Sequence, residues 1–192
     1  MKKIPTLFKR EFEGHKVAKI TSEVHPGMEW VLEGEGEATE KVDGSCCAII
    51  DGKFYKRYDA KKGKKPPEGA IPCCEADPVT GHHPHWVPVD RDAPENRWLV
   101  QAYVNSLTLH RGLLEDGTYE AYGPAFNGNP EGARWNELYR HGNHKLRCCP
   151  RDFEGIKEYL RNIPIEGVVF WKDGEPQCKI RRKDFGFDWP VR

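Results

Sequence analysis

Apolar residues occur in short runs that polar residues, glycines and prolines interrupt. Three Asp-Gly pairs, Asp51-Gly52, Asp116-Gly117 and Asp173-Gly174, lie between such runs. Because Asp-Gly readily adopts the left-handed conformations of tight two-residue turns, each pair predicts a β-hairpin. The fourth pair, Asp43-Gly44, lies inside an apparent strand, where a turn is not expected. The pattern predicts a chain dominated by antiparallel hairpins.

Helical periodicity is rare. Apolar residues recur at helical spacing in the segment from Asp152 to Arg161, and Pro164 closes it, so a helix is predicted there. Residues 98–109 fit either a strand or a helix. Residues 66–94 are rich in Pro, Gly and His and are predicted to form a long, partly ordered excursion. The fold class predicted from these patterns is α+β, rich in antiparallel sheet and with few helices.

The chain has 192 residues, of which 38% are apolar, a length typical of one domain. We therefore expect a single domain over residues 1–192. No stretch approaches the roughly 20 apolar residues of a membrane helix, so no membrane partner is expected. Six of the seven cysteines form adjacent pairs, which rarely bridge each other. This pattern predicts a reduced, cytoplasmic protein in which the cysteines are small core residues.

The charged residues are balanced overall but segregated along the chain. Thirty basic residues offset thirty acidic ones. Residues 23–43 carry seven acids and one base, whereas residues 51–65 carry seven bases and two acids. Residues 177–183 carry four bases and no acid. A chain with no net charge can therefore still present a basic groove to an anionic ligand.

Lys41 is the one base in the acidic stretch, and Val42, Asp43 and Gly44 follow it. A lysine amine has a reference pKa of about 10.4 and must lose its proton to act as a nucleophile. A metal ion, neighbouring cations or burial favour the neutral amine. Asp43 would point the same way as Lys41 on a strand, where it could position the lysine or hold a hydrated metal ion. A surface Lys–Asp pair is the alternative interpretation of this motif alone.

The segment Glu40–Gly44 resembles the nucleophile motif of covalent nucleotidyltransferases, which include ATP-dependent RNA and DNA ligases and GTP-dependent mRNA capping enzymes. Further segments resemble the other motifs of that superfamily in the right order. The resemblance covers residues 40 to about 185, and two more segments are most similar to small RNA ligases. The motif segments are 56–58, 119–124 with 127–130, 166–169 and 179–183, and the RNA-ligase-like segments are 78–88 and 183–186.

This resemblance implies an antiparallel nucleotidyltransferase domain, the ATP-grasp-like adenylyltransferase domain of ligases. Only 13 residues follow Lys179, so no C-terminal oligonucleotide-binding barrel is expected. The implied function is an ATP-dependent RNA ligase that joins 5′-phosphate and 3′-OH RNA ends through a lysyl-AMP and an RNA-adenylate. ATP and Mg²⁺ (or Mn²⁺) are the implied cofactors. An mRNA capping guanylyltransferase, a DNA ligase-like enzyme and a non-catalytic RNA-binding relative are the alternatives.

The resemblance also implies roles for individual residues. The acidic and basic ones are expected to contact a metal ion, the ribose or a phosphate. The aromatic residue that stacks on adenine stays open among Phe126, Trp135 and Tyr139. The implied roles are nucleophile for Lys41, adenine contacts for Glu40 and for Val168 or Val169, ribose or AMP phosphate for Arg57, ribose hydroxyl for Glu120, metal for Glu166 and Asp43, and α-phosphate for Lys179 and Arg181.

Two further clusters have open interpretations. Three histidines between residues 82 and 85, with Cys73 and Cys74, raise the question of zinc. Their spacing fits no C-x-x-C pattern, and Pro84 interrupts the run. Residues 140–147 form a second basic stretch that could contact RNA phosphates or be an ordinary solvated loop.

Overall fold

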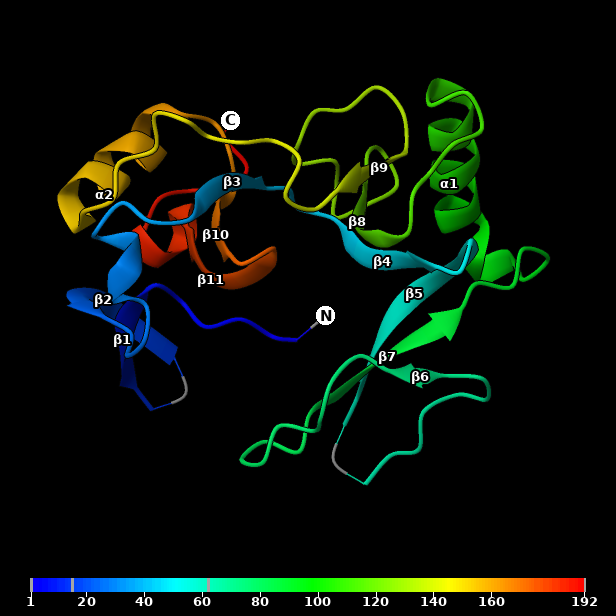
Figure 1. The fold of residues 1–192 in the computed structure, drawn as a ribbon, viewed down its shortest axis with the longest axis horizontal. Coiled ribbons are helices and arrows are strands. Elements are labelled where there is room, and N and C mark those ends of the chain that lie inside the picture. The colour runs from blue at the N-terminus through cyan, green and yellow to red at the C-terminus, as the bar shows by residue number, and fades with distance from the viewer. Residues whose placement is uncertain (1, 15, 62, 192) are drawn as a thin grey trace. The chain divides into compact units, whose positions relative to one another are not determined.

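The computed structural model describes residues 2–14, 16–61 and 63–191 (Figure 1). The chain forms two compact units. Unit 1 comprises Met1–Lys3 and Asp43–His141, and unit 2 comprises Ile4–Val42 and Gly142–Arg192. The chain passes from one unit to the other after Lys3, after Val42 and after His141.

Unit 1 contains a six-stranded sheet in which every neighbouring pair of strands is antiparallel. The tight turn at Asp51 and Gly52, both with positive φ, joins its two central strands. In spatial order the strands are β6 (Ile71–Pro72), β7 (His83–Pro88), β5 (Lys53–Ala60), β4 (Ser45–Ile50), β8 (Gly117–Tyr122) and β9 (Glu137–Arg140).

The two faces of this sheet differ in character. Helix α1 (Arg97–Leu109) covers one face, where Ala102 and Tyr103 join a buried cluster with Cys47 and Ile49 of β4. Successive side chains of a strand point to opposite faces. Cys46 of β4 therefore lies on the face that α1 does not cover. This second face has an apolar part, built on Ala48, Tyr55 and Trp86, and a polar part described below.

Unit 2 contains a three-stranded antiparallel sheet and a two-stranded one. Helix α2 (Phe153–Asn162) packs its buried residues Ile156 and Leu160 into the core of the larger sheet. That core includes Val168, Phe170 and Ile180, all fully buried. The larger sheet has the order β11 (Glu175–Arg181), β10 (Gly167–Lys172), β3 (Glu37–Lys41), and the smaller one pairs β1 (Phe8–Glu13) with β2 (Lys16–Val24). Short 3₁₀ helices span Glu29–Val31 and Arg182–Phe185 in unit 2 and Pro94–Asn96 in unit 1.

Two of the three predicted hairpins are confirmed, at Asp51-Gly52 and Asp173-Gly174. The hairpin predicted at Asp116-Gly117 is wrong, because no strand precedes β8 there. The Asp116 carboxylate instead accepts hydrogen bonds from the backbone N–H groups of Asp51 and Gly52, at 2.7 and 3.0 Å. It therefore stabilises the turn of a neighbouring hairpin.

The predicted helix at 152–161 is confirmed as α2, and Asp152 caps it by accepting from the Gly155 N–H at 2.8 Å. Residues 98–109, left open between strand and helix, are helical. The predicted excursion at 66–94 is partly wrong, because it contains β7, an inner strand of the sheet whose Trp86 and Val87 are buried. Two prolines and two histidines among its six residues obscured that strand in the sequence.

The structure confirms the predicted fold class, α+β with mostly antiparallel sheet and two α-helices among the described residues. Within the same residues, neither α1 nor α2 nor any shorter helix has the length and apolar character needed to cross a bilayer.

Candidate functional site

Lys41 is the last residue of β3, and its side chain lies on the face of the three-stranded sheet opposite the core. Gly167 of β10 is its partner on one neighbouring strand, and Arg181 of β11 is the partner of Gly167 on the other. Lys179 lies two residues before Arg181, so it shares this face. The register thus places Lys41, Lys179 and Arg181 on one surface, as expected for groups that bind a phosphate together.

Position 167 requires a glycine for a structural reason. A Cβ atom at this position would lie 2.2 Å from the carbonyl oxygen of Ile180, closer than real side chains approach backbone. The glycine therefore permits the close pairing of β10 with β11. It also leaves the row between Lys41 and Arg181 without a central side chain.

Glu166 is the immediate partner of Lys41. The lysine Nζ donates to Glu166 Oε2 at 2.5 Å, and the two side chains are only 23% and 11% exposed. The Glu166 backbone oxygen accepts from the Arg182 N–H at 2.9 Å, which fixes the start of β10 against β11. Since a carboxylate is costly to bury without a partner, this ion pair accounts for a charged residue at the entry of an otherwise apolar strand.

The electrostatic environment of Lys179 shows how positive this face is. Burial and the nearby charges of Lys41 and Arg181 lower the pKa of Lys179 to about 8, although Glu166 opposes the shift. Arg181 is held by Asp184, which accepts from its Nη2 at 3.0 Å. The face therefore combines closely spaced cations with one carboxylate, an arrangement suited to a phosphate ester near a lysine.

Val168 does not lie on this face. It is fully buried among the core residues that pack against α2, so its side chain has no surface to offer a base. This corrects the assignment of Val168 as an adenine contact, since the residue packs in the core of the sheet. Val169, which pairs with Thr39 and Lys179, alternates onto the Lys41 face and is half-buried.

Glu40 also points away from Lys41, toward the opposite side of β3. Its carboxylate Oε2 pairs with His144 Nδ1 at 2.5 Å. The Glu40 backbone N–H donates to the His144 carbonyl oxygen at 3.0 Å. Both the side chain and the N–H of Glu40 are therefore engaged within unit 2.

Asp43 is the first residue of the main segment of unit 1. It is held by Asn127, which lies in one of the motif segments, and by Glu131, which the sequence did not single out. Asn127 Nδ2 donates to Asp43 Oδ1 at 2.7 Å and to the Gly44 carbonyl oxygen at 3.0 Å. Glu131 Oε1 accepts from the Asp43 N–H at 2.7 Å. Asn127 has a positive φ of 48°, which asparagine tolerates well. The segment 127–131 thus fixes Asp43.

Gly44 explains the Asp-Gly pair that did not fit a turn. β3 ends at Lys41 and β4 begins at Ser45, so the pair lies in the break between the two sheets. A Cβ atom on Gly44 would lie 2.2 Å from the carbonyl oxygen of Ala121 in β8. The glycine is needed because the backbone enters the six-stranded sheet in close contact with β8.

Arg57 and Glu120 lie on the face of the six-stranded sheet that α1 does not cover, on β5 and β8. Arg57 Nε pairs with Asp59 Oδ1 at 2.8 Å. It also lines a cavity of about 420 Å³ together with Lys2 and His82. Arg57 is thus a half-buried cation beside a hollow, as a phosphate or ribose contact requires.

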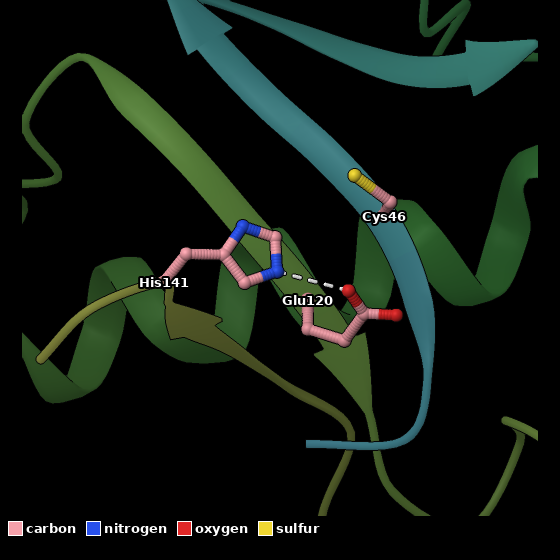
Figure 2. A group of neighbouring side chains, drawn as sticks. All are labelled: Cys46, Glu120 and His141. Carbon is pink, nitrogen blue, oxygen red and sulfur yellow. Dashed lines mark hydrogen bonds and ion pairs between the residues drawn. The ribbon is translucent and has the colours of Figure 1, made fainter. Parts of the chain in front are cut away.

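Glu120 has close neighbours that the sequence did not connect with it (Figure 2). His141 Nε2 lies 2.9 Å from Glu120 Oε2, and His141 Nδ1 lies 3.0 Å from Thr118 Oγ1. Cys46 is the direct partner of Glu120 across β4 and β8. Burial and the Glu120 carboxylate raise the pKa of the Cys46 thiol to about 12. The signal for this cluster is strand register, which no local pattern reveals.

The three aromatic candidates for an adenine contact differ in exposure. Phe126 is buried in the core beneath α1 and is not available for stacking. Trp135 is 57% exposed, and the Arg134 guanidinium lies over its ring, 5.2 Å from the ring centroid. Tyr139 is half-buried on the same face as Glu120, its partner across β8 and β9. Exposure therefore keeps Trp135 and Tyr139 as candidates.

The second basic stretch, residues 140–147, is engaged by acidic side chains within the protein. Arg140 pairs with Glu115, His144 with Glu40 and Lys145 with Glu37. These pairs reduce the charge available to RNA. The histidines and cysteines of residues 73–85 do not gather into a metal-binding group in the part of the chain that the structure describes.

Comparison with known proteins supports the resemblance to RNA ligases. The chain is 29% identical to RNA ligase 1 of Rattus norvegicus and to that of Mus musculus, in each case over 80% of this chain and 68% of the relative. It is 27% identical to RNA ligase 1 of Pongo abelii over 95% of this chain and 77% of the relative. No family profile matches the chain. The relatives confirm the resemblance to RNA ligases that the ordered motifs predicted.

Proposed function

We propose that this protein is an ATP-dependent RNA ligase that joins 5′-phosphate and 3′-OH ends. The observation that carries the proposal is the Lys41 face of the three-stranded sheet, where Lys41, Lys179 and Arg181 surround Glu166. The similarity to proteins named RNA ligase 1 supports RNA as the substrate class. The covalent nucleotidyltransferase fold and mechanism are part of the proposal.

In the first step, Lys41 Nζ attacks the α-phosphorus of ATP. A phosphorus–nitrogen bond forms, the bond from the α-phosphorus to the bridging oxygen breaks, and pyrophosphate leaves. The lysine must give up a proton before or during this attack. Lys179 and Arg181 lie on the same face of the three-stranded sheet as Lys41. The same two cations would hold the α-phosphate, since phosphoryl transfer depends chiefly on positioning and charge neutralisation.

Glu166, in unit 2, is the proposed ligand of Mg²⁺ or Mn²⁺, and the motif resemblance also assigns Asp43, in unit 1, to a metal. Carboxylate oxygens match the hard-cation preference of both ions. Glu166 is held in place by its backbone bond to Arg182, and Asp43 by Asn127. When bound, the ion would neutralise charge on the phosphates and occupy the carboxylate that otherwise pairs with Lys41.

In the second step, an oxygen of the RNA 5′-phosphate attacks the same phosphorus, the phosphorus–nitrogen bond breaks, and Lys41 regains a proton. The product is an RNA-adenylate. In the third step, the 3′-OH of the other RNA end attacks the 5′-phosphorus, AMP leaves, and the hydroxyl proton is released. Arg57 and Glu120 are proposed to contact the AMP phosphate and ribose. Glu40 is not assigned to the adenine edge, because its carboxylate pairs with His144 on the opposite side of β3 and its N–H is also engaged there. Val169 replaces Val168 as the proposed apolar contact of the base.

The decisive experiment is covalent labelling with α-labelled ATP or GTP and Mg²⁺, followed by denaturing electrophoresis. The proposal expects label from ATP that is lost in Lys41→Ala and kept in Lys19→Ala, a matched control at an exposed lysine of unit 2. Label from GTP alone would instead favour a capping guanylyltransferase. Absence of label from either nucleotide would contradict the covalent mechanism and favour a non-catalytic RNA-binding relative.

The end chemistry needs a separate assay with RNA of defined ends. RNA with a 5′-phosphate and a 3′-OH should be joined, whereas RNA with a 5′-OH should not react. RNA with a 5′-phosphate and a blocked 3′ end should accumulate the RNA-adenylate. Joining of DNA ends at an equal rate would overturn the assignment of RNA as the preferred substrate.

A further inference from the structure

We propose that Cys46, Glu120 and His141 form a binding site for a transition-metal ion of the Zn²⁺ class. The thiol, one carboxylate oxygen and one ring nitrogen all lie within 4.8 Å of one another. Within residues 2–14, 16–61 and 63–191, this is the one group of three or more His, Cys, Asp or Glu side chains with that spacing. The proposal does not depend on the ligase activity, because it concerns the protein without nucleotide.

The three side chains come from three separate strands or strand ends. Cys46 is on β4, Glu120 is its direct partner on β8, and His141 follows β9 (Figure 2). The His141 backbone N–H donates to the Thr118 carbonyl oxygen at 3.1 Å, which extends the pairing of β9 with β8. Backbone hydrogen bonds therefore set the positions of all three donors, and no loop must fold to assemble them.

The spacing suits a tetrahedral ion. With metal–ligand distances of about 2.0–2.3 Å, the donor atoms of a tetrahedral zinc site lie about 3.3–3.6 Å apart. The Glu120 Oε2 to His141 Nε2 distance is 2.9 Å, and no pair in the group exceeds 4.8 Å. Small side-chain rotations bridge these differences. Three protein ligands leave a fourth position for water or another small ligand.

The donor set selects the metal. One sulfur, one imidazole nitrogen and one carboxylate oxygen suit Zn²⁺ and Co²⁺ better than Mg²⁺, which prefers oxygen ligands alone. Binding releases the Cys46 thiol proton to solvent. A thiolate and a carboxylate then balance a divalent cation, with neutral His141 as the third ligand. The half-buried site would thus carry no net charge.

A second hydrogen bond orients the imidazole for this task. Thr118 Oγ1 lies 3.0 Å from His141 Nδ1. If Nδ1 carries the proton, it donates to Thr118 and leaves the Nε2 lone pair directed at the Glu120 oxygen. Such a hydrogen bond to the ring nitrogen that does not bind the metal is typical of metal-bound histidines. A bound ion accepts the Nε2 lone pair and so removes the repulsion between that lone pair and the Glu120 carboxylate.

The neighbouring charges are compatible with a cation. Arg57 approaches the Cys46 thiol from β5 and disfavours a positive ion there. Asp59, however, pairs with Arg57 at 2.8 Å and offsets its charge. This environment should lower the affinity of the site without removing it.

The experiment is stoichiometric titration of the metal-stripped protein with Co²⁺ and then Zn²⁺, followed by visible and near-ultraviolet spectroscopy. Tetrahedral Co²⁺ gives visible d–d absorption, and a bound thiolate adds a near-ultraviolet charge-transfer band. The expected result is saturation at one equivalent with both features, which Zn²⁺ then abolishes. Failure of the folded protein to take up either ion would overturn the proposal.

Five variants, one of them a control, test the assignment of the ligands. Cys46→Ser should remove the charge-transfer band, whereas Cys73→Ser, at another half-buried cysteine of unit 1, should keep it. Glu120→Gln and His141→Ala should each weaken binding. Thr118→Val should weaken binding roughly 10–100-fold, as expected for loss of a partner that orients a ligand. Circular dichroism shows which variants are folded, and an unchanged band in folded Cys46→Ser would refute the site.

Discussion

Lys41 and Glu166 form an ion pair between the end of β3 and the residue that precedes β10, with Lys41 Nζ donating to Glu166 Oε2 at 2.5 Å. The pair is largely shielded from solvent and has Lys179 as a close cationic neighbour. Without Glu166, Lys41 would lose the carboxylate that offsets its repulsion with Lys179. The carboxylate therefore has two roles in the proposed enzyme, since it stabilises the resting protein and supplies a metal ligand.

Replacing Glu166 with Gln should impair adenylylation while preserving the fold. The amide keeps the volume and a hydrogen-bond acceptor, but it removes the negative charge that the metal and Lys41 require. We expect the rate of AMP attachment to fall by about 10²–10³-fold, the usual effect of losing one electrostatic contact to a reacting phosphate or oxyanion. The measurement is the single-turnover rate of label transfer from ATP at saturating Mg²⁺.

The control for that variant is Glu175→Gln, at an exposed position of β11. It removes the same charge from the same unit without touching the Lys41 face, so its rate should match that of the unmodified protein. A folded Glu166→Gln protein that forms lysyl-AMP at the normal rate would exclude Glu166 as a metal ligand.

Lys179 should make ATP binding sensitive to mildly alkaline pH. Burial and the charges of Lys41 and Arg181 lower its pKa to about 8, from an ordinary value of 10.5. Below pH 8 the amine is charged and attracts phosphate, whereas above pH 8 it becomes neutral. The association constant for ATP should then fall by up to about tenfold per pH unit. Lys179→Arg keeps its charge throughout, so its affinity should stay nearly constant.

The stability of the protein should respond in the opposite direction over the same range. The unfolded chain keeps the Lys179 proton up to pH 10.5, whereas the folded protein releases it above pH 8. Because the unfolded state then binds more protons, the Lys179 contribution to the free energy of unfolding rises between these values. Urea unfolding of the unmodified protein and of Lys179→Arg at pH 7.5 and 10 would test this, and identical pH profiles would contradict the shifted pKa.

The sequence predicted the Lys41 face better than the surroundings of its members. Alternation on a strand sufficed to place Lys179 and Arg181 together, because their strand was correctly expected. The choice between Val168 and Val169 required knowing which face α2 covers, since both residues are apolar. That information lies in packing between distant segments and not in the local pattern.

The Cys46, Glu120 and His141 cluster illustrates a second limit. Each residue was noticed, but as a core cysteine, a ribose ligand and a member of a basic stretch. Their proximity follows from the register of β4 with β8 and from the path of the chain after β9. Register is fixed by the whole sheet, so a single sequence does not reveal which residues on separate strands become neighbours.

Asn127→Asp should disturb Asp43 by removing a hydrogen-bond donor and adding a negative charge. Aspartate tolerates the positive φ of this position, but it cannot donate the 2.7 Å hydrogen bond to Asp43 Oδ1. Two carboxylates would face each other, and we expect a loss of about 1–3 kcal/mol in the free energy of unfolding at pH 7. The loss should shrink below about pH 4, where carboxylates become protonated. Urea unfolding at both pH values measures it.

Asn143→Asp is the matched control, because it adds the same charge at an exposed asparagine of unit 2. It should change the stability by less than about 0.5 kcal/mol. If Asn127→Asp were equally neutral at pH 7, the hydrogen bond to Asp43 would have no role in holding that residue.

Gly44→Ala should destabilise unit 1 because of a backbone clash and not because of backbone strain. The added Cβ would lie 2.2 Å from the Ala121 carbonyl oxygen and 3.0 Å from Glu120 Cγ, so β4 and β8 would have to move apart. Overpacking of this kind typically costs about 1–3 kcal/mol.

The comparison variant is Gly52→Asn, where φ is +69° and no atom lies within 4 Å of the added Cβ. Asparagine tolerates that conformation, so this variant should lose less than about 1 kcal/mol. Thermal unfolding of both variants separates the two causes, since equal melting temperatures would show that Gly44 is not required for the close approach of β4 to β8.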